Sequence, residues 1–186
     1  MKITKVTEDA VATLLDDLLK RSPNNYTGYA DKVQAIIDDV RERGDEELFE
    51  MTKRFDGADL NADNIRVTQA EIDEAYTLVD ASLIEVIRKA MTNIRVYHEK
   101  QRQYGWFDTT PDGTILGQKV TPLQSTGVYV PGGKAAYPSS VLMNVIPAKV
   151  AGVEKIVMVT PPGKDGKVNP GTLVAANESG ADEIYK

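Results

Sequence analysis

The sequence predicts an α/β protein in which a mainly helical amino-terminal region precedes a parallel βαβαβ unit. Composition divides the chain in this way, because the first 100 residues hold only 3 of the 14 glycines and 1 of the 9 prolines. Charge divides it too, with 14 basic and 21 acidic residues in that first part, a net charge of −7, and a net charge of +1 in the remainder. Apolar residues recur at helical spacing in the first part, whereas short apolar segments alternate with helix-compatible stretches in the second.

Helices in the first part are indicated by two apolar stripes, formed by Tyr29, Val33, Ile36, Ile37 and Val40 and by Leu83, Ile87, Ala90, Met91 and Ile94. Start signals agree with them. Thr68 with Glu71 and Ser82 with Glu85 have the spacing of capping boxes, and the acidic residues 45–47 suit a first helical turn. We expect helices near residues 7–21, 27–43, 45–55, 69–77 and 81–103, with a short strand at 65–67.

In the second part, apolar strands alternate with helices. An extended segment or hairpin at 114–124 precedes expected strands at 127–130, 156–159 and 182–185, and helices at 139–150 and 170–179 separate these strands. Pro170 suits a helix start and Gly180 a helix end. Continuous apolar strands predict a parallel sheet covered on both faces. The unit has the size of an incomplete Rossmann-like fold, and we expect two domains, 1–120 mainly helical and 121–186 Rossmann-like.

Composition also excludes several functions. A net charge of −6 argues against nucleic-acid binding. The longest aliphatic stretch is residues 156–159, far short of the ~20 residues that span a bilayer, and acidic residues stand where a secretory signal would be apolar. The chain has one histidine and no cysteine, so it cannot assemble the ligands of a zinc site by itself. We therefore expect a cytoplasmic protein, with no metal ligands in this chain.

The segment from Gly127 to Asn144 is the most informative for chemistry. It places a glycine-rich turn between a strand end and a helix start, where open α/β sheets bind ligands. Gly132 and Gly133 permit a close backbone approach, Tyr129 offers a ring and a hydroxyl, and Ser139 and Ser140 could cap the helix. The pattern fits neither a Walker A loop nor a dinucleotide fingerprint. Spacing alone leaves a ligand-binding turn and a purely structural turn equally open.

Five segments together resemble the amino-terminal part of histidinol dehydrogenase. They are Ser125 to Asn144, Pro147 to Val153, Val159 to Pro162, Val40 to Leu48 and Thr52 to Gly57. The resemblance implies a homodimeric, NAD-dependent oxidoreductase of histidine biosynthesis that contains zinc and oxidises L-histidinol through L-histidinaldehyde to L-histidine. It also implies that Tyr129, in its Tyr-Val-Pro-Gly-Gly motif, contacts NAD, with Gly132 and Gly133 as neighbours in the cofactor site.

The same resemblance places the zinc ligands and the catalytic Glu-His pair of the family beyond Lys186, so we expect this chain to hold no catalytic residue and to be inactive alone. Two alternatives remain open. One is a non-catalytic module that binds a nucleotide or a protein, and the other is a related zinc-dependent alcohol dehydrogenase of the same family.

For four further residues and one strand edge, the sequence favours a structural role over a functional one. His98 and Lys134 are interpreted as surface residues, although Lys134 could also meet a pyrophosphate. Trp106 and Phe107 are interpreted as packing anchors at the junction between the two parts. An incomplete sheet should also leave an open strand edge at residues 182–185.

Overall fold

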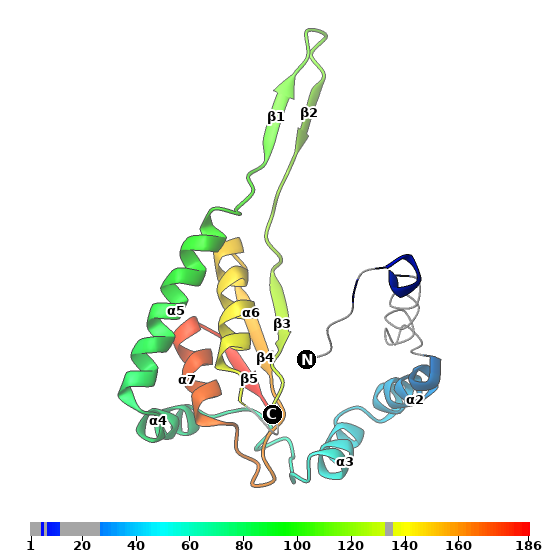
Figure 1. Cartoon of the computed structure of the whole chain (residues 1–186), viewed down its shortest axis with the longest axis vertical. Coiled ribbons are helices and arrows are strands. Elements are labelled where there is room, and N and C mark those ends of the chain that lie inside the picture. Colours follow the sequence, from blue (N-terminus) through cyan, green and yellow to red (C-terminus); the bar gives the residue numbers. More distant parts are fainter. Residues whose placement is uncertain (1–4, 6, 12–26, 133–135) are drawn as a thin grey trace. The chain divides into compact units, whose positions relative to one another are not determined.

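The computed structural model describes residues 5, 7–11, 27–132 and 136–186. The chain divides into two compact units, Met1–Glu47 and Leu48–Lys186. Figure 1 shows the elements of both units, which we describe one at a time. The domain boundary at residue 120 that the sequence suggests stays a prediction. The two units divide at an earlier residue, because helices α4 (Gln69–Leu78) and α5 (Ala81–Glu99) pack against the two helices that connect the strands of the parallel sheet.

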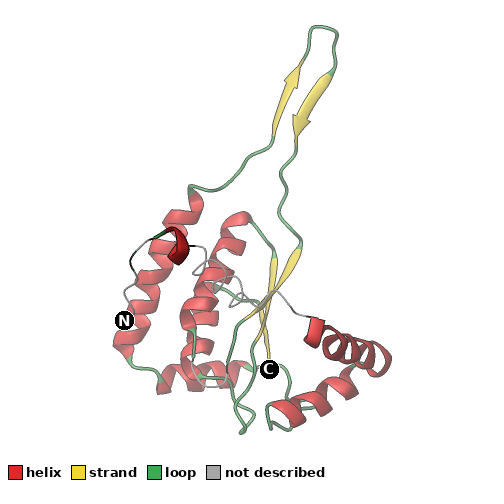
Figure 2. Ribbon diagram, turned by 45° about the vertical axis from the view of Figure 1, so that its right-hand side comes forward, coloured by secondary structure: helices red, strands yellow, loops and turns green. Residues whose placement is uncertain are grey.

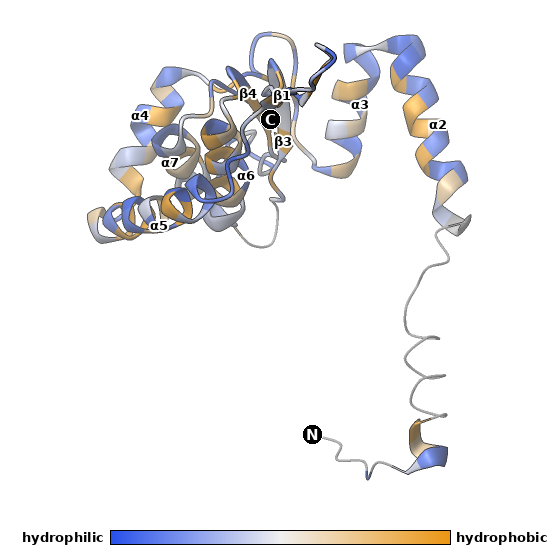
Figure 3. Ribbon diagram, turned by 90° about the horizontal axis from the view of Figure 1, so that it is seen from above, coloured by the Kyte–Doolittle hydropathy of each residue, from blue (hydrophilic) through white to orange (hydrophobic). Residues whose placement is uncertain are grey.

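The first unit is helical in its described residues. Helix α2 spans Thr27–Arg43, and helix α3, Asp45–Phe55, begins in this unit and ends in the next. Both ranges confirm the sequence prediction. The helix expected at 7–21 lies mostly outside the described residues, of which 8–11 are helical. Three acidic residues occupy the first turn of α3, where they interact favourably with the helix dipole. Figure 3 shows apolar residues at intervals along α2.

In the second unit, α4 spans Gln69–Leu78 and α5 spans Ala81–Glu99. The capping box at the start of α4 is confirmed: Thr68 Oγ1 accepts from the Glu71 N–H, and Glu71 Oε2 accepts from the Thr68 N–H at 2.8 Å. The box predicted at Ser82 is wrong. Asp80 caps α5 instead, accepting from the Ser82 N–H at 2.7 Å, because its carboxylate stands two residues earlier at the position where the helix begins.

The parallel sheet contains strands β3 (Ser125–Tyr129), β4 (Lys155–Val159) and β5 (Glu183–Tyr185), in that spatial order. Helix α6 (Pro138–Ala151) connects β3 to β4, and α7 (Pro170–Ser179) connects β4 to β5. The βαβαβ prediction is therefore confirmed. The bounds of α7 match the prediction, since Pro170 opens the helix and Gly180 ends it with a left-handed φ of 90°.

Helices α6 and α7 lie on a single face of this sheet, and α4 and α5 pack against these two helices to complete a helical layer (Figures 1 and 2). Ile156, Met158 and Ile184 point into that layer and are buried, whereas Tyr129 and Val159 on the opposite face are 65% and 44% exposed. The described helices of this unit thus lie on one face only, and the expectation of a sheet covered on both faces stays a prediction. Each crossover connects neighbouring strands in the same direction, and right-handed crossovers of this kind place both helices on the same side.

The outer edge of β5 is covered. Arg66 forms an antiparallel bridge with Tyr185, the Val67 N–H donates to the Ile184 carbonyl at 2.9 Å, and the Lys186 N–H donates to the Ile65 carbonyl at 2.9 Å. The strand predicted at 65–67 is therefore present as a single bridge. The open edge expected at 182–185 is wrong, because this earlier segment supplies the missing backbone partners.

An antiparallel hairpin of β1 (Trp106–Thr109) and β2 (Ile115–Gln118) joins α5 to β3. Every residue of both strands is exposed. The hairpin begins eight residues before the segment expected to form it. The packing role expected for Trp106 and Phe107 is wrong in the described chain, where both side chains lie in solvent. Among the described helices, none is long and apolar enough to cross a membrane.

Candidate functional site

The segments that follow β3 and β4 meet at the carboxyl edge of the parallel sheet. Gly132 lies in the first of them, and a Cβ atom built on it would stand 2.8 Å from the carbonyl oxygen of Pro161 in the second. No side chain fits at that separation, so glycine is required for the two backbones to approach this closely. Gly132 therefore allows the segments after β3 and β4 to lie close together at the carboxyl edge, where α/β sheets bind ligands.

Two helices begin at this edge. Helix α6 starts at Pro138, and its N-cap residue Tyr137 makes no side-chain capping hydrogen bond. The caps expected from Ser139 and Ser140 are wrong, because both residues already lie in the first turn of the helix. Helix α7 starts beside α6, since a Cβ built on Gly171 would lie 3.6 Å from Cγ of Pro138. The two helix N-termini place their positive dipole ends together at the carboxyl edge.

A cavity of about 350 Å³ opens at the same edge, and its lining includes Gly132, Ala136, Thr160, Pro161, Lys167 and Asn169. Asn169 caps α7 by accepting from the Thr172 N–H at 3.3 Å. Thr160, the residue after β4, is buried, and its N–H donates to the Tyr185 carbonyl at 3.1 Å. The cavity thus has backbone walls that are fixed by hydrogen bonds and by the register of the sheet.

Among the described residues that line this cavity, Lys167 is the one cation. Its Nζ lies 2.9 and 3.0 Å from the two carboxylate oxygens of Glu74 on α4, and this pair raises the pKa of Lys167 above the ordinary lysine value. Asp165 Oδ1 accepts from the Lys167 N–H at 3.1 Å and fixes the backbone of the turn. The ammonium group therefore stays charged, but it is already balanced by a carboxylate.

The structure separates the three residues that the sequence singles out. Gly132 lines the cavity, whereas Tyr129 ends β3 with its side chain on the exposed face of the sheet, beside Val159 of β4. Gly133 and Lys134 lie outside the described residues. Sequence reasoning missed Thr160 and Asn169. The Asn-Pro pair at 169–170 is a helix-start signal that could have directed attention to this wall.

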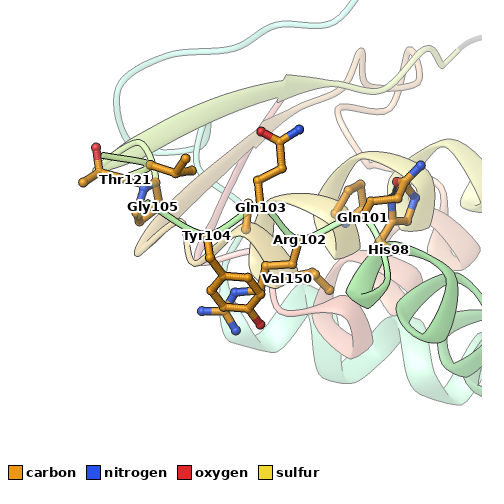
Figure 4. Close-up of a pocket in the computed structure, with 12 residues that line it drawn as sticks. His98, Gln101, Arg102, Gln103, Tyr104, Gly105, Thr121 and Val150 are labelled. Atoms are coloured by element: carbon orange, nitrogen blue, oxygen red, sulfur yellow. Dashed lines mark hydrogen bonds between the residues drawn. The ribbon is translucent and has the colours of Figure 1, made fainter. Parts of the chain in front are cut away.

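A second cavity, of about 380 Å³, lies at the opposite edge of the unit, between the ends of α5 and α6 (Figure 4). His98 lines it and contacts Gln101, with 2.7 Å between Nδ1 and Oε1. The described residues contain no group of three or more His, Cys, Asp or Glu side chains that could hold a metal ion. His98 is thus a surface residue with an amide partner, as expected from the sequence.

Comparison with known proteins decides the family. The family model described as histidinol dehydrogenase matches residues 19–186. The chain belongs to the histidinol dehydrogenase family. It is 54% identical over 171 residues to the histidinol dehydrogenase of Heliobacterium mobile, covering 92% of this chain and 40% of that protein. It is 58% identical over 169 residues to that of Bacillus subtilis, covering 90% and 39%.

A solved structure agrees with this assignment. The crystal structure of histidinol dehydrogenase from Elizabethkingia anophelis superposes with a TM-score of 0.79 at 37% identity, over 85% of this chain and 36% of that one. The resemblance to histidinol dehydrogenase and the α/β fold class are therefore confirmed. The chain spans about two fifths of the length of the curated histidinol dehydrogenases that it matches.

Proposed function

We propose that this chain forms the NAD-contacting part of a histidinol dehydrogenase, an enzyme that oxidises L-histidinol through L-histidinaldehyde to L-histidine in histidine biosynthesis. The family match supports this activity. The matched relatives are longer than this chain, so the activity is proposed for a protein of their full length. We further propose that the protein works in the cytoplasm and as a homodimer. NAD, when bound, accepts the hydride that the substrate alcohol loses.

The close approach of Gly132 to Pro161, beside a cavity and two helix N-termini, is the observation that carries the cofactor assignment. A pyrophosphate is doubly anionic, and the start of α6 offers it a positive dipole end without a side-chain cap. Tyr129, at the same edge of the sheet, offers an exposed ring for stacking on a planar ring of the cofactor. We propose Tyr129, Gly132 and Gly133 as cofactor-binding residues.

The residues present do not fit the zinc ion of the family. The sequence has a single histidine and no cysteine, and the described residues contain no cluster of three or more metal-ligating side chains. Catalytic zinc usually needs three protein ligands, and a histidine base would be required in addition. We therefore propose that the 186 residues bind NAD but do not oxidise histidinol by themselves.

Isothermal titration of NAD into the 186-residue chain tests the cofactor assignment. Tyr129→Ala should weaken binding by about 5- to 140-fold, because a stacked base contributes about 1–3 kcal/mol. Tyr97→Ala is the matched control, since Tyr97 on α5 is equally exposed, at 62%, and lies away from the cavity. Equal affinities of the two variants would overturn the role of Tyr129.

Two further results would contradict the wider proposal. If the unmodified chain showed no heat of NAD binding, this part would not hold the cofactor. If the purified chain reduced NAD in the presence of histidinol, measured by absorbance of the reduced cofactor, the proposed absence of catalytic groups would be wrong.

A further inference from the structure

The cavity between the ends of α5 and α6 adjoins another cavity of about 410 Å³, and together they form one recess. Arg102, Tyr104 and Val150 line both cavities and mark the place where they join. Figure 4 shows Arg102 and Tyr104 side by side there. All residues that line the recess belong to the second unit. Small-molecule sites usually measure about 300–1,000 Å³, so the recess can hold a small organic ligand.

Three cations line one half of the recess. Arg95 lies on α5, Arg102 lies in the turn that continues this helix, and Lys149 lies on α6. The turn is held in place because the Arg102 N–H donates to the Glu99 carbonyl at 3.4 Å. Lys149 is already balanced, since its Nζ donates to Asp182 Oδ2 at 2.9 Å. The charge that is left for a ligand therefore comes from the two arginines, opposed by the one carboxylate of this half, Glu99.

Within the described part of the chain, neither of these arginines has an anionic partner. Glu99 stands four residues after Arg95 and three before Arg102, spacings at which ion pairs form along a helix, yet it pairs with neither. The Arg102 guanidinium stacks on the Tyr104 ring, 5.4 Å from its centroid, and Arg95 is partly buried. A guanidinium that has lost part of its hydration without gaining an acceptor is stabilised by an external anion.

The other half of the recess is apolar with amide groups at its side. Pro122, Pro147 and Val150 supply the apolar wall, and Gln101 and Gln103 carry the amides. Among the described residues that line this half, none is acidic. An apolar wall that adjoins two unpaired guanidinium groups suits a ligand in which an anionic group is attached to a flat ring.

We propose that this recess binds a small phosphate monoester that carries a flat ring, with the phosphate between Arg95 and Arg102 and the ring against Pro147 and Val150. Arginine suits this ligand, because its planar guanidinium donates two parallel hydrogen bonds to phosphate oxygens. A phosphate monoester carries a charge of about −1.5 to −2 near neutral pH, so one ligand can balance both arginines. The site shares no lining residue with the cavity at the carboxyl edge and is independent of the proposed cofactor site.

Isothermal titration of phenyl phosphate into the 186-residue chain at low ionic strength tests the proposal. Arg95→Gln and Arg102→Gln should each weaken binding by about 10- to 140-fold, the range expected when a hydrogen bond to a charged group is lost. Arg54→Gln is the matched control and should leave the affinity unchanged. Arg54 on α3 also stacks on a neighbouring ring, 5.1 Å from the Phe55 centroid, and lines neither cavity. Unchanged affinity in both recess variants, or no binding to the unmodified chain, would overturn the site.

Two other ligands test the chemical class. Inorganic phosphate should bind at least about fivefold more weakly than phenyl phosphate, because it leaves the apolar wall in water. Benzoate should also bind more weakly, because its single charge cannot balance both arginines. If either ligand bound as tightly as phenyl phosphate, the assigned class would be wrong.

Glu99 provides a test in the opposite direction. Glu99→Gln should tighten the binding of phenyl phosphate by about two- to fivefold, because it removes a like charge from the wall beside the phosphate. A merely structural role of this wall would not produce a gain in affinity. An affinity no higher than that of the unmodified chain would contradict the placement of the phosphate.

The same samples separate this inference from the function proposed above. Tyr129→Ala should leave the affinity for phenyl phosphate unchanged, and Arg102→Gln should leave the affinity for NAD unchanged, because the recess and the carboxyl-edge cavity share no residue. If Tyr129→Ala weakened phenyl phosphate instead, the ligand would bind at the carboxyl edge and the recess proposal would fail while the NAD result stood. Far-ultraviolet circular dichroism of each variant checks that the fold of the unit is retained.

Discussion

Arg88 on α5 and Glu178 on α7 form a two-pronged ion pair across the helical layer. The guanidinium donates through Nε to Glu178 Oε2 at 3.0 Å and through Nη2 to Oε1 at 2.8 Å. The hydroxyl of Tyr76 on α4 donates to the same Oε1 at 2.8 Å. One carboxylate thus joins three helices, and the geometry is the bidentate arrangement in which arginine–carboxylate pairs are strongest.

Removing this carboxylate should destabilise the layer. Glu178→Ala removes the acceptor of the Tyr76 hydroxyl and one of the two carboxylates that bind Arg88, and we expect the free energy of unfolding to fall by about 1–3 kcal/mol in urea titrations. Glu85→Ala is the control, because Glu85 bonds the same arginine from a carboxylate that is 71% exposed. Its loss should cost less than about 1 kcal/mol. Equal losses in the two variants would contradict the central role of Glu178.

The pair of Arg88 and Glu178 also makes the free energy of unfolding depend on pH. The hydrogen bonds from Arg88, in opposition to burial, hold the pKa of Glu178 below its ordinary value of 4.5. A carboxylate with a lowered folded-state pKa contributes stability above its unfolded pKa and loses this contribution as the pH falls through its folded pKa. The unfolding free energy of the unmodified chain should therefore fall more steeply below pH 4.5 than that of Glu178→Gln. Parallel pH profiles would refute this assignment.

Local signals in the sequence are enough to predict much of the fold. The bounds of α2, α3 and α7 are predicted correctly, because apolar spacing, acidic first turns and the Pro170 and Gly180 signals act within one helix. The start of α5 is harder to predict. Asp80 and Ser82 are both good caps, and only the backbone conformation at Asp80 decides between them.

The candidate site depends more on tertiary structure. The glycine-rich turn is visible in the sequence, but the approach of Gly132 to Pro161 depends on the pairing of β3 with β4. The position of Thr160 in the cavity wall also depends on this strand pairing, because Thr160 directly follows β4. The exposure of Trp106 also could not be predicted, because apolar side chains normally indicate a core, and a hairpin that exposes both faces departs from that rule.

The requirement for glycine at position 132 can be measured directly. Gly132→Ala should lower the unfolding free energy by about 1–3 kcal/mol, because the added methyl group meets the Pro161 carbonyl and forces the two segments apart. Gly127→Ala on the neighbouring strand is the control, since a Cβ there meets no atom within 4 Å. It should change stability by less than about 1 kcal/mol. If the two variants were equally stable, the close approach would not constrain the edge.

Helix α6 should contribute most to the core of the second unit, because Val141, Val145 and Ile146 on it are fully buried. Ile146→Ala removes methyl groups from the packed space between α6, its neighbouring helices and the sheet, and should lower the unfolding free energy by about 2–5 kcal/mol. Met143→Ala on the same helix is the control, since Met143 is 54% exposed, and it should cost less than about 1 kcal/mol. Urea titrations of both variants measure the difference. A loss for Ile146→Ala no larger than that for Met143→Ala would mean that this core does not hold the layer on the sheet.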